Sequence, residues 1–455
     1  MSKKIHFKLI FTILLPALFL CCNKKEFLDE KPDSDFVIPT TLNDCRRLLD
    51  NERVMSETPV LGELSADDYY MPYNFWMNLN TREKNAYIWE KNIYQGETGI
   101  GDWDKPYEQV FYANVVRETL LKIEGPDRNK PEWSELYGAT FFIRAYAFHN
   151  LLQVFSPVYD PALSEQENAL GIPLRLEQDI NPKSVRATVK ESYDQIINDL
   201  HAALYYLPVG IPYQLNRPSK PAAYALMARV YLSKREFDSA LYYADKSLEL
   251  HSYLLNYDDP VPPVFDDNPE VLYQSRLLST TSVLKAFVVP DCIVDSNLYR
   301  SYDTNDLRRS LYFTSTPNPK PGYYGGIFLF SGLATDEVYL IKAESLAETG
   351  NFTEGINVLN HLLQYRYRSG TFTPKTASNK EAALTQILTE RRKELVFRGL
   401  RWTDLRRLNK DGRNITLKRM LDKEYILPPN HPNYVLPIPP DVPVFFKENL
   451  REEIP

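Results

Sequence analysis

The sequence predicts an all-α protein whose scaffold consists of antiparallel helix pairs of the tetratricopeptide kind. Residues 217–250 form the first pair, because a line of small residues including Ala228 follows one helix and Ala240 lies at the crossing position of the next. Residues 335–365 repeat the pattern, with Ala343 and Gly355 at the equivalent positions. One pair cannot bury its own apolar face, so further pairs are expected.

Length and composition are those of a large globular protein. The chain has 455 residues, 44% of them hydrophobic, and it contains 31 tyrosines and 33 prolines. Prolines beside so many aromatic residues indicate long, rigid, irregular connections rather than disorder. The net charge of −7 makes nucleic acid an unfavourable partner.

The N-terminus carries a targeting signal. Lys3, Lys4 and Lys8 precede an apolar run, Leu9–Leu20, that is too short to span a bilayer. Cys21-Cys22 follows it, so residues 1–21 are predicted to be a lipoprotein signal peptide and Cys22 the lipidated residue. Acyl chains on Cys22 would tether the mature chain to a membrane. An ordinary secretory signal is the alternative.

Helical periodicity and capping signals locate the helices. Thr188 and Glu191 form a capping box ahead of an apolar stripe, and Ser219 is expected to cap the first helix of residues 217–250. We expect helices at Leu42–Leu49, Tyr107–Leu121, Glu132–Phe155 and Tyr193–Leu207, two within Pro218–Leu250, and others at Thr335–Thr349, Thr353–Tyr365 and Glu381–Leu408.

Three stretches lack helical periodicity. Residues 60–104 are rich in aromatic side chains, residues 251–334 are rich in proline, and residues 425–455 hold eight prolines. Irregular stretches of this length inside a compact domain are usually functional, and the proline-rich tail is expected to wrap, extended, over the folded part. We expect one domain, residues 22–455, with its helical core at about 105–250 and 335–408.

No catalytic, metal or cofactor motif is present in the sequence. It contains no P-loop, no G-x-S-x-G elbow and no histidine pair at zinc-ligand spacing. A glycosidase needs two carboxylates, and nothing among the 60 acidic residues selects a pair. The arginines of Glu390–Arg407 could bind an anion, but the acids between them favour ion pairing. Cys45 and Cys292 are too few for a disulfide framework, and whether they pair is open.

Short blocks in a fixed order along the whole chain resemble the SusD-like (RagB/SusD) family. They are Cys22 with Phe27-Leu28-Asp29, Trp103 with Tyr107 and Asn114, Arg144-Ala145-Tyr146 before Gly171-Ile172-Pro173, Arg186-Ala187-Thr188, Ala228-Arg229-Val230-Tyr231, Leu340-Ile341-Lys342-Ala343-Glu344, Glu390-Arg391-Arg392-Lys393-Glu394 with Arg401-Trp402 and Asp404-Leu405, and Pro437-Ile438-Pro439. Arg398 departs from the pattern, since the family often has an acid there, which puts one ion pair on the helix surface in doubt.

The resemblance implies a binding protein rather than an enzyme. Similar proteins have four tetratricopeptide-like helix pairs with a loop-built ligand face. They are lipid-anchored outside the outer membrane, where they cover a SusC-like TonB-dependent transporter and capture oligosaccharides, or peptides in some relatives. A scaffold that binds only protein is the third hypothesis.

Aromatic side chains in the irregular stretches are the candidate ligand contacts, because sugar rings present apolar C–H faces to them. The candidates are Tyr73, Trp76, Trp89 and Tyr94 in the first stretch and Tyr299, Tyr302, Tyr323 and Tyr324 in the second. Each could instead belong to the core. Asp67-Asp68 and Asp303 with Asp306 could supply polar contacts or a surface cation site, although plain solvation is the favoured alternative. Trp103 is expected to be structural.

Overall fold

The computed structural model of the protein describes residues 39–163, 169–259, 268–279, 292–314, 318, 328–442 and 444–445. The predicted signal peptide and Cys22 lie outside the described residues, and so do Tyr323 and Tyr324. The described residues from Thr41 onward belong to one compact unit. Within the described part of the chain, no helix combines the length and the apolar character needed to cross a membrane.

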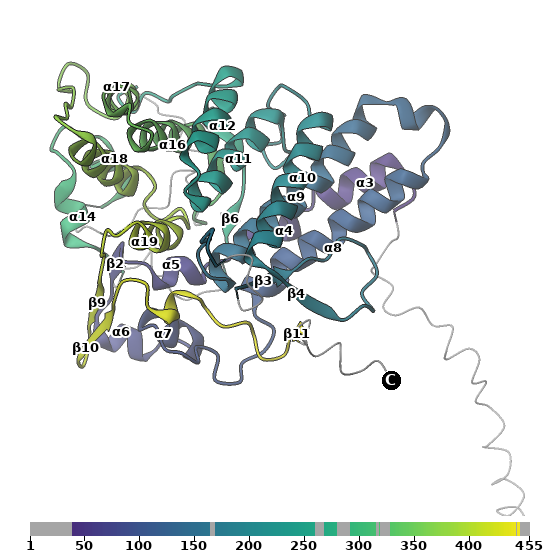
Figure 1. The fold of residues 1–455 in the computed structure, drawn as a ribbon, viewed down its shortest axis with the longest axis horizontal. Helices are drawn as coiled ribbons and strands as arrows, with labels where there is room; N and C mark the ends of the chain where they lie inside the picture. Colours follow the sequence, from purple (N-terminus) through teal and green to yellow (C-terminus); the bar gives the residue numbers. More distant parts are fainter. Residues whose placement is uncertain are drawn as a thin grey trace, which may run out of the picture. The chain divides into compact units, whose positions relative to one another are not determined.

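Antiparallel helices packed on their sequence neighbours make up most of this unit (Figure 1). The helices are α3 (Leu42–Leu49), α8 (Gly101–Lys122), α9 (Pro131–Phe155), α10 (Val189–Tyr206), α11 (Lys220–Lys234), α12 (Phe237–Leu250), α16 (Thr335–Glu348), α17 (Phe352–Leu363) and α18 (Lys380–Glu394). α8 packs on α9, α9 on α10, α11 on α12, α12 on α16 and α16 on α17. The all-α prediction with interrupted repeats is therefore confirmed.

The start of α10 is capped as predicted, whereas the start of α11 is not. Thr188 Oγ1 accepts from the Glu191 N–H at 3.1 Å, and the Thr188 N–H donates to Glu191 Oε2 at 2.7 Å. Ser219 precedes α11, but its buried hydroxyl has no hydrogen-bond partner. A capping hydroxyl accepts from the second or third helical residue, and Pro221 in the second place has no N–H to offer.

Small residues allow the second predicted helix pair to approach closely. A Cβ on Gly355 of α17 would lie 2.7 Å from the carbonyl oxygen of Ala343 and 3.3 Å from the nitrogen of Ala347, both in α16. Ala343 and Ala347 are themselves fully buried. The crossing predicted from Ala343 and Gly355 is therefore confirmed.

The two irregular stretches contain short elements that sequence periodicity could not show. The first is preceded by α4 (Glu52–Met55) and β1 (Glu57–Thr58) and holds α5 (Leu61–Ser65), β2 (Tyr69–Tyr70), α6 (Tyr73–Met77) and α7 (Thr81–Tyr87). The described part of the second holds β5 (Val271–Tyr273), β6 (Arg276–Leu277), β7 (Ile293–Val294), α14 (Ser296–Ser301), α15 (Arg308–Tyr312) and β8 (Leu333–Ala334). β1 pairs with β6 in parallel and β2 with β7 antiparallel, so the two stretches are joined to each other by backbone hydrogen bonds.

The predicted helix Glu381–Leu408 is two helices. α18 ends at Glu394, and α19 (Arg401–Lys410) begins after a short break. Phe397 and Gly399 in the break have positive φ angles of 59° and 73°. Two left-handed residues so close together cannot continue a right-handed helix, and glycine adopts this conformation without steric cost.

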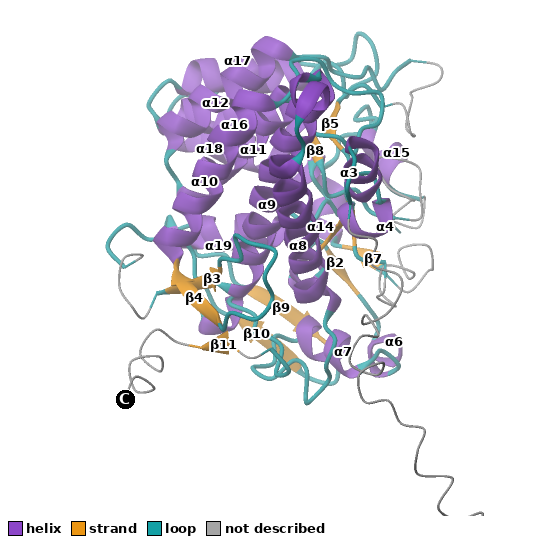
Figure 2. Cartoon of the chain, turned by 90° about the vertical axis from the view of Figure 1, so that its right-hand side faces the viewer, coloured by secondary structure: helices purple, strands orange, loops and turns teal. Residues whose placement is uncertain are grey.

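The C-terminal segment lies against the rest of the folded part, as far as it is described. β9 (Leu417–Met420) and β10 (Glu424–Leu427) form an antiparallel hairpin. The chain then runs extended. The Leu436 N–H donates to the Val154 carbonyl oxygen, and the Tyr94 hydroxyl donates to the Pro437 carbonyl oxygen. The segment ends beside β4 (Ser184–Thr188), which pairs with β11 (Val444–Phe445) on one edge and β3 (Leu170–Pro173) on the other, and Figure 2 shows these strands below α10.

Replacing Gly355 by Ala should destabilise the protein although alanine favours helix. Helix propensity would gain about 1 kcal/mol, but the new methyl group must push α16 and α17 apart, at a cost of about 1–3 kcal/mol. Urea unfolding of the mature protein measures the difference. Gly210→Ala is the control, because nothing lies within 4 Å of its added Cβ. Equal midpoints for the two variants would contradict the close crossing.

Candidate ligand-binding surface

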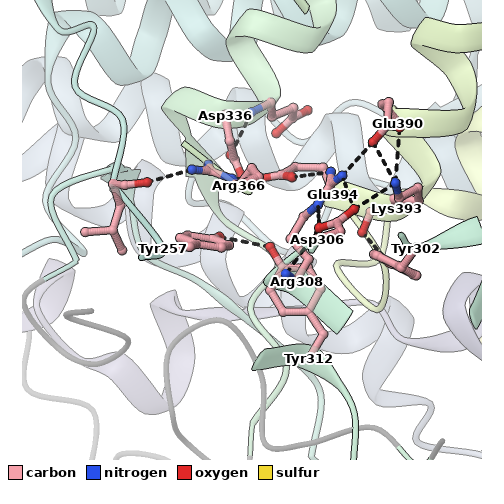
Figure 3. Close-up of polar contacts among 12 residues, drawn as sticks. Tyr257, Tyr302, Asp306, Arg308, Tyr312, Asp336, Arg366, Glu390, Lys393 and Glu394 are labelled. Carbon is pink, nitrogen blue, oxygen red and sulfur yellow. Dashed lines mark hydrogen bonds and ion pairs between the residues drawn. The ribbon is translucent and has the colours of Figure 1, made fainter. Parts of the chain in front are cut away.

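A buried ion network holds the second irregular stretch on α18 (Figure 3). Arg308, at the start of α15, donates to both oxygens of Asp306 at 2.8 and 2.7 Å. Its Nη2 also reaches Glu390 at 2.6 Å, and its Nη1 reaches Glu394 at 2.8 Å, one turn further along α18. The side chains of these four residues are 0–3% exposed. Removing one partner from such a group leaves an uncompensated charge in the interior, which costs about 3–5 kcal/mol.

Arg366, which follows α17, extends the network to the start of β5. It donates to Glu394 at 2.6 Å, to Glu270 at 2.7 Å and to the Leu255 carbonyl oxygen at 2.7 Å. Lys393 of α18 lies 2.8 Å from Asp306. Charged side chains therefore tie the residues around β5, α15 and α18 into one buried cluster.

The first irregular stretch is held by α18 and by the next helix, α19. Asp67 accepts from Arg401 at 2.7 and 3.0 Å, and Asp68 accepts from Arg392 at 2.8 Å. Arg392 also lies 3.6 Å from Asp295, just before α14. Asp67 and Asp68, predicted as polar contacts or a cation site, instead anchor the chain. No group of acids, histidines or cysteines among the described residues is arranged to hold a metal ion.

The arginines of Glu390–Arg407 form ion pairs, as the sequence favoured. Arg391 pairs with Asp404 at 2.9 Å, and Arg407 pairs with Asp404 and Glu344. Arg398, the residue that departs from the family pattern, is buried and pairs with Asp336 at 2.6 Å. The departure therefore coincides with an interior ion pair rather than a surface one.

Aromatic rings from two distant segments meet at the surface beside α6. The ring centroids of Tyr73 and Trp76 are 5.8 Å apart, and Tyr425 of β10 lies 6.4 Å beyond Trp76. Tyr73 is 40% exposed, whereas Trp76 is 9% exposed and its indole N–H donates to the Lys84 carbonyl oxygen. Tyr70 is also exposed. We call Tyr70, Tyr73, Trp76 and Tyr425 the aromatic surface.

Polar side chains flank the aromatic surface on the hairpin. Asp422 accepts from the Tyr425 hydroxyl at 3.2 Å, and Lys423 Nζ lies 5.0 Å from the centroid of the same ring. Half-exposed rings beside charged groups can hold an apolar ring face while hydrogen bonds read its substituents.

Four predicted contact residues do not present open rings. Trp89, Tyr94 and Tyr302 are 2–3% exposed, and each donates to a backbone carbonyl oxygen: Ser65, Pro437 and Lys393 respectively. Tyr299 is half-buried against Phe313 and lies under the Arg309 guanidinium. Sequence showed that these residues are aromatic and lie in irregular stretches, but irregular backbone does not imply an exposed side chain. Asp306 is likewise buried, whereas Asp303 is exposed.

Sequence reasoning missed two residues of the hairpin. Tyr425 completes the aromatic surface, and buried Arg419 holds the hairpin on the first irregular stretch. The Arg419 guanidinium lies 4.3 Å from the Tyr87 ring centroid and 5.2 Å from that of Trp89, and it donates to the carbonyl oxygens of Ala66 and Tyr69. The available signal was a short alternating stretch broken by a turn at Asp422-Lys423, which predicts a hairpin but not its partner.

Burial perturbs two carboxyl groups of these ion clusters, Glu63 and Glu270. Burial raises the pKa of Glu63 to about 8, and the neighbouring Asp68 adds to the effect. Glu63 Oε2 accepts from the Gly399 N–H at 2.9 Å, while Oε1 has no hydrogen-bond partner. Burial likewise raises the pKa of Glu270 to about 8 despite Arg366. Glu63 therefore favours the neutral form in the fold near pH 7.

Fold and site together define a helical-repeat binding scaffold that carries a loop-built surface on one side. A sequence profile described as "Starch-binding associating with outer membrane" matches residues 26–232, and the profile of the SusD family matches residues 335–441. The chain belongs to the SusD-like family.

Individual relatives cover most of the chain. SusD-like protein P2 of Formosa agariphila is 24% identical over 408 residues, which are 74% of this chain and 76% of that protein. A SusD superfamily crystal structure from Bacteroides thetaiotaomicron superposes with a TM-score of 0.70 at 19% identity and covers 88% of this chain and 96% of its own. A SusD-like carbohydrate binding protein from Bacteroides vulgatus gives a TM-score of 0.65 at 18% identity, over 89% of this chain and 96% of its own. These structures share the fold.

Glu63→Gln should make stability less dependent on pH. The native pKa of about 8 lies above the ordinary value of 4.5, so the unfolded chain releases the proton first as pH rises. The stabilisation is complete below pH 4.5 and is lost as pH rises through 8. Between pH 5.5 and 8.5 the wild type should lose about 3 kcal/mol more than the variant.

Unfolding midpoints at several pH values measure this difference. Glu354→Gln is the control because Glu354 is exposed, and it should keep the wild-type profile. A Glu63→Gln variant whose profile parallels the wild type would show that Glu63 ionises normally in the fold.

Proposed function

We propose that the protein captures oligosaccharides outside the outer membrane and delivers them to a SusC-like TonB-dependent transporter. In this proposal Cys22 carries the lipid anchor and the domain faces the cell exterior. The protein binds its ligand without transforming it. The observation that carries the proposal is the aromatic surface, which is built from two segments far apart in the sequence. The first of these segments is anchored at Asp67 by its ion pair with Arg401.

Support for a saccharide ligand comes from the family and from the chemistry of the surface. One family profile is described as starch-binding and associated with the outer membrane, and one structural relative is described as carbohydrate binding. Tyr73 and Tyr425 offer apolar ring faces, while Asp422 and Lys423 offer an acceptor and a donor for hydroxyl groups. Flat aromatic rings lose little conformational entropy when a ligand binds, because they have few rotatable bonds.

Rigid support under the surface favours binding. A ligand that orders a mobile loop loses part of its binding free energy to that ordering. Here α6 is followed by α7, whose Asn80 cap accepts from the Glu83 N–H at 2.9 Å, and the hairpin is held by Arg419. The rings are therefore placed before a ligand arrives.

Tyr73→Ala combined with Tyr425→Ala should weaken oligosaccharide binding by at least about tenfold, since each aromatic contact contributes about 0.5–1.5 kcal/mol beyond its buried area. Calorimetry with maltoheptaose, cellohexaose, xylohexaose and mannohexaose measures the loss of affinity. A peptide array tests whether the protein binds peptides instead. Helicity should stay unchanged, because Tyr73 is 40% exposed.

Tyr205→Ala with Tyr213→Ala is the matched control. These tyrosines are 79% and 89% exposed and belong to neither α6 nor the hairpin, so affinity should not change. Equal losses in both double variants would contradict the aromatic surface as the site. Binding to peptides alone would favour a peptide-capturing relative, and co-purification with a barrel protein without any small ligand would favour a scaffold that binds only protein.

Cys22→Ala should abolish membrane attachment of the mature protein. The thiol of Cys22 is the proposed acylation point, so palmitate labelling and recovery in the outer-membrane fraction should both be lost. Cys21→Ala is the control and should keep both. If Cys22→Ala stays in the membrane fraction with its label, the anchor is elsewhere, and a soluble wild-type protein would support the ordinary secretory signal.

A further inference from the structure

A cavity with an aromatic floor lies beside α8, and none of its lining residues belongs to α6. It has a volume of about 250 Å³ and lies between α8 and the chain that joins β3 to β4. Trp103, Tyr107 and Phe111 line it from α8, and Arg175, Glu177 and Asp179 line it from the connecting chain. None of these residues belongs to the aromatic surface.

The floor is a regular helical stripe that the neighbouring elements do not cover fully. Residues spaced by four lie on one face of a helix, which places Trp103, Tyr107 and Phe111 in a row along α8. The centroids of Trp103 and Tyr107 are 4.9 Å apart, and Phe155 meets Trp103 edge-on at 5.1 Å. The Tyr107 hydroxyl donates to the Pro173 carbonyl oxygen at 2.8 Å, so the rings are fixed in place.

Trp103 brings a hydrogen-bond donor to this cavity that the fold does not use. The ring is 5% exposed, but its indole N–H makes no hydrogen bond to the described residues and is open to solvent. The indoles of Trp76, Trp89 and Trp133 all donate to backbone carbonyl oxygens. Trp402 also lacks an acceptor, but its N–H is sealed in the interior, whereas that of Trp103 is not. The N–H of Trp103 is therefore available to a ligand oxygen.

The wall of the cavity is built and held. Asn114 of α8 donates to the carbonyl oxygens of Arg175 and Glu177, both at 3.1 Å. Arg117 and Arg144 donate to the Leu176 carbonyl oxygen, at 2.8 and 3.2 Å. Arg144 is in turn fixed by the buried Asp199 at 2.6 Å. These bonds fix the position of the connecting chain relative to the rings.

The charges on the wall select the class of occupant. Glu177 and Asp179 are exposed carboxylates beside one guanidinium, that of Arg175, so an anion would be repelled more than attracted. A purely apolar ligand would leave three charged groups without water. A neutral sugar ring fits both sets of groups, since it has C–H faces for the floor and hydroxyl groups for the wall.

The cavity continues along the connecting chain. A neighbouring hollow of about 300 Å³ shares Pro173, Arg175, Glu177, Asp179 and Ser184 with it. Ligand sites usually start at about 300 Å³, so the first cavity alone is small and the two together suit a short oligosaccharide end.

We infer that this groove is a second saccharide subsite, which takes one or two neutral pyranose rings of an oligosaccharide. Tyr107 and Phe111 form the apolar floor, the Trp103 N–H donates to a sugar oxygen, and Arg175, Glu177 and Asp179 bond the hydroxyl groups at the mouth. The inference rests on the proposed function, because it assigns a second contact to the same class of ligand.

Paired tryptophan variants of the full mature protein test this subsite. Trp103→Phe removes an N–H that bonds no described residue, so the melting temperature should fall only through the loss of buried ring area, while saccharide affinity at this subsite should fall roughly fivefold. Trp133→Phe removes an N–H that donates to Leu120 at 2.9 Å, so it should lower the melting temperature and leave affinity unchanged. The second variant also measures the effect of exchanging indole for phenyl.

Indole N–H signals of ¹⁵N-tryptophan-labelled protein give the direct readout, since the chain has five tryptophans. Titration with maltotetraose, cellotetraose, xylotetraose and mannotetraose should move the signal that disappears in Trp103→Phe. If a saccharide moves only the Trp76 signal, or binds with equal affinity to both variants, the second subsite is refuted and the proposed function stands. If no probe binds, the failure extends to the proposed function as well.

Discussion

The structure depends on arginines buried against carboxylates between irregular segments and helices. Arg308, Arg366 and Glu394 are 0% exposed, and their ion pairs join the residues around β5 and α15 to α18. Charges in the interior are tolerated only when every partner is in place. Short strands and one-turn helices bury too little apolar area to hold themselves, so this requirement gives them a single arrangement that apolar contacts alone would not specify. A well-packed apolar core could be more stable, but it would constrain these segments less.

The same constraint connects the helical repeats to the aromatic surface. Asp67 forms an ion pair with Arg401, and Asp68 forms one with Arg392. Arg392 also lies near Asp295 in the other irregular stretch. One pair of helices therefore positions both stretches. Glu63 lies in this cluster without an arginine of its own and keeps its proton near pH 7 because of burial, so the cluster is less stable when that proton is lost.

Sequence reasoning succeeded where local chemistry decides the structure and failed where distant contacts decide it. The helices of the array were predictable, because apolar periodicity, the Thr188–Glu191 capping box and the small residues Ala343 and Gly355 act over a few positions. The break at Gly399 was hidden, because an arginine-rich stretch favours helix on either side of it. The aromatic surface was half predictable. Tyr73 and Trp76 share a helix, but Tyr425 joins them only through the fold, and burial of Trp89, Tyr94 and Tyr302 follows from tertiary packing.

The C-terminal segment connects the aromatic surface to the cavity on α8. Residues 428–442 leave the hairpin that carries Tyr425 and arrive at the cavity on α8, where Val442 is part of the lining. Between these points two hydrogen bonds hold the segment. The Tyr94 hydroxyl donates to the Pro437 carbonyl oxygen, and the Gly99 N–H donates to the Asp441 carboxylate. A linear oligosaccharide that binds at both ends gains effective concentration at the second contact, provided that the two contacts keep a fixed separation. A proline-rich segment, which has little conformational freedom and is tied at both ends, maintains such a separation better than a flexible loop would.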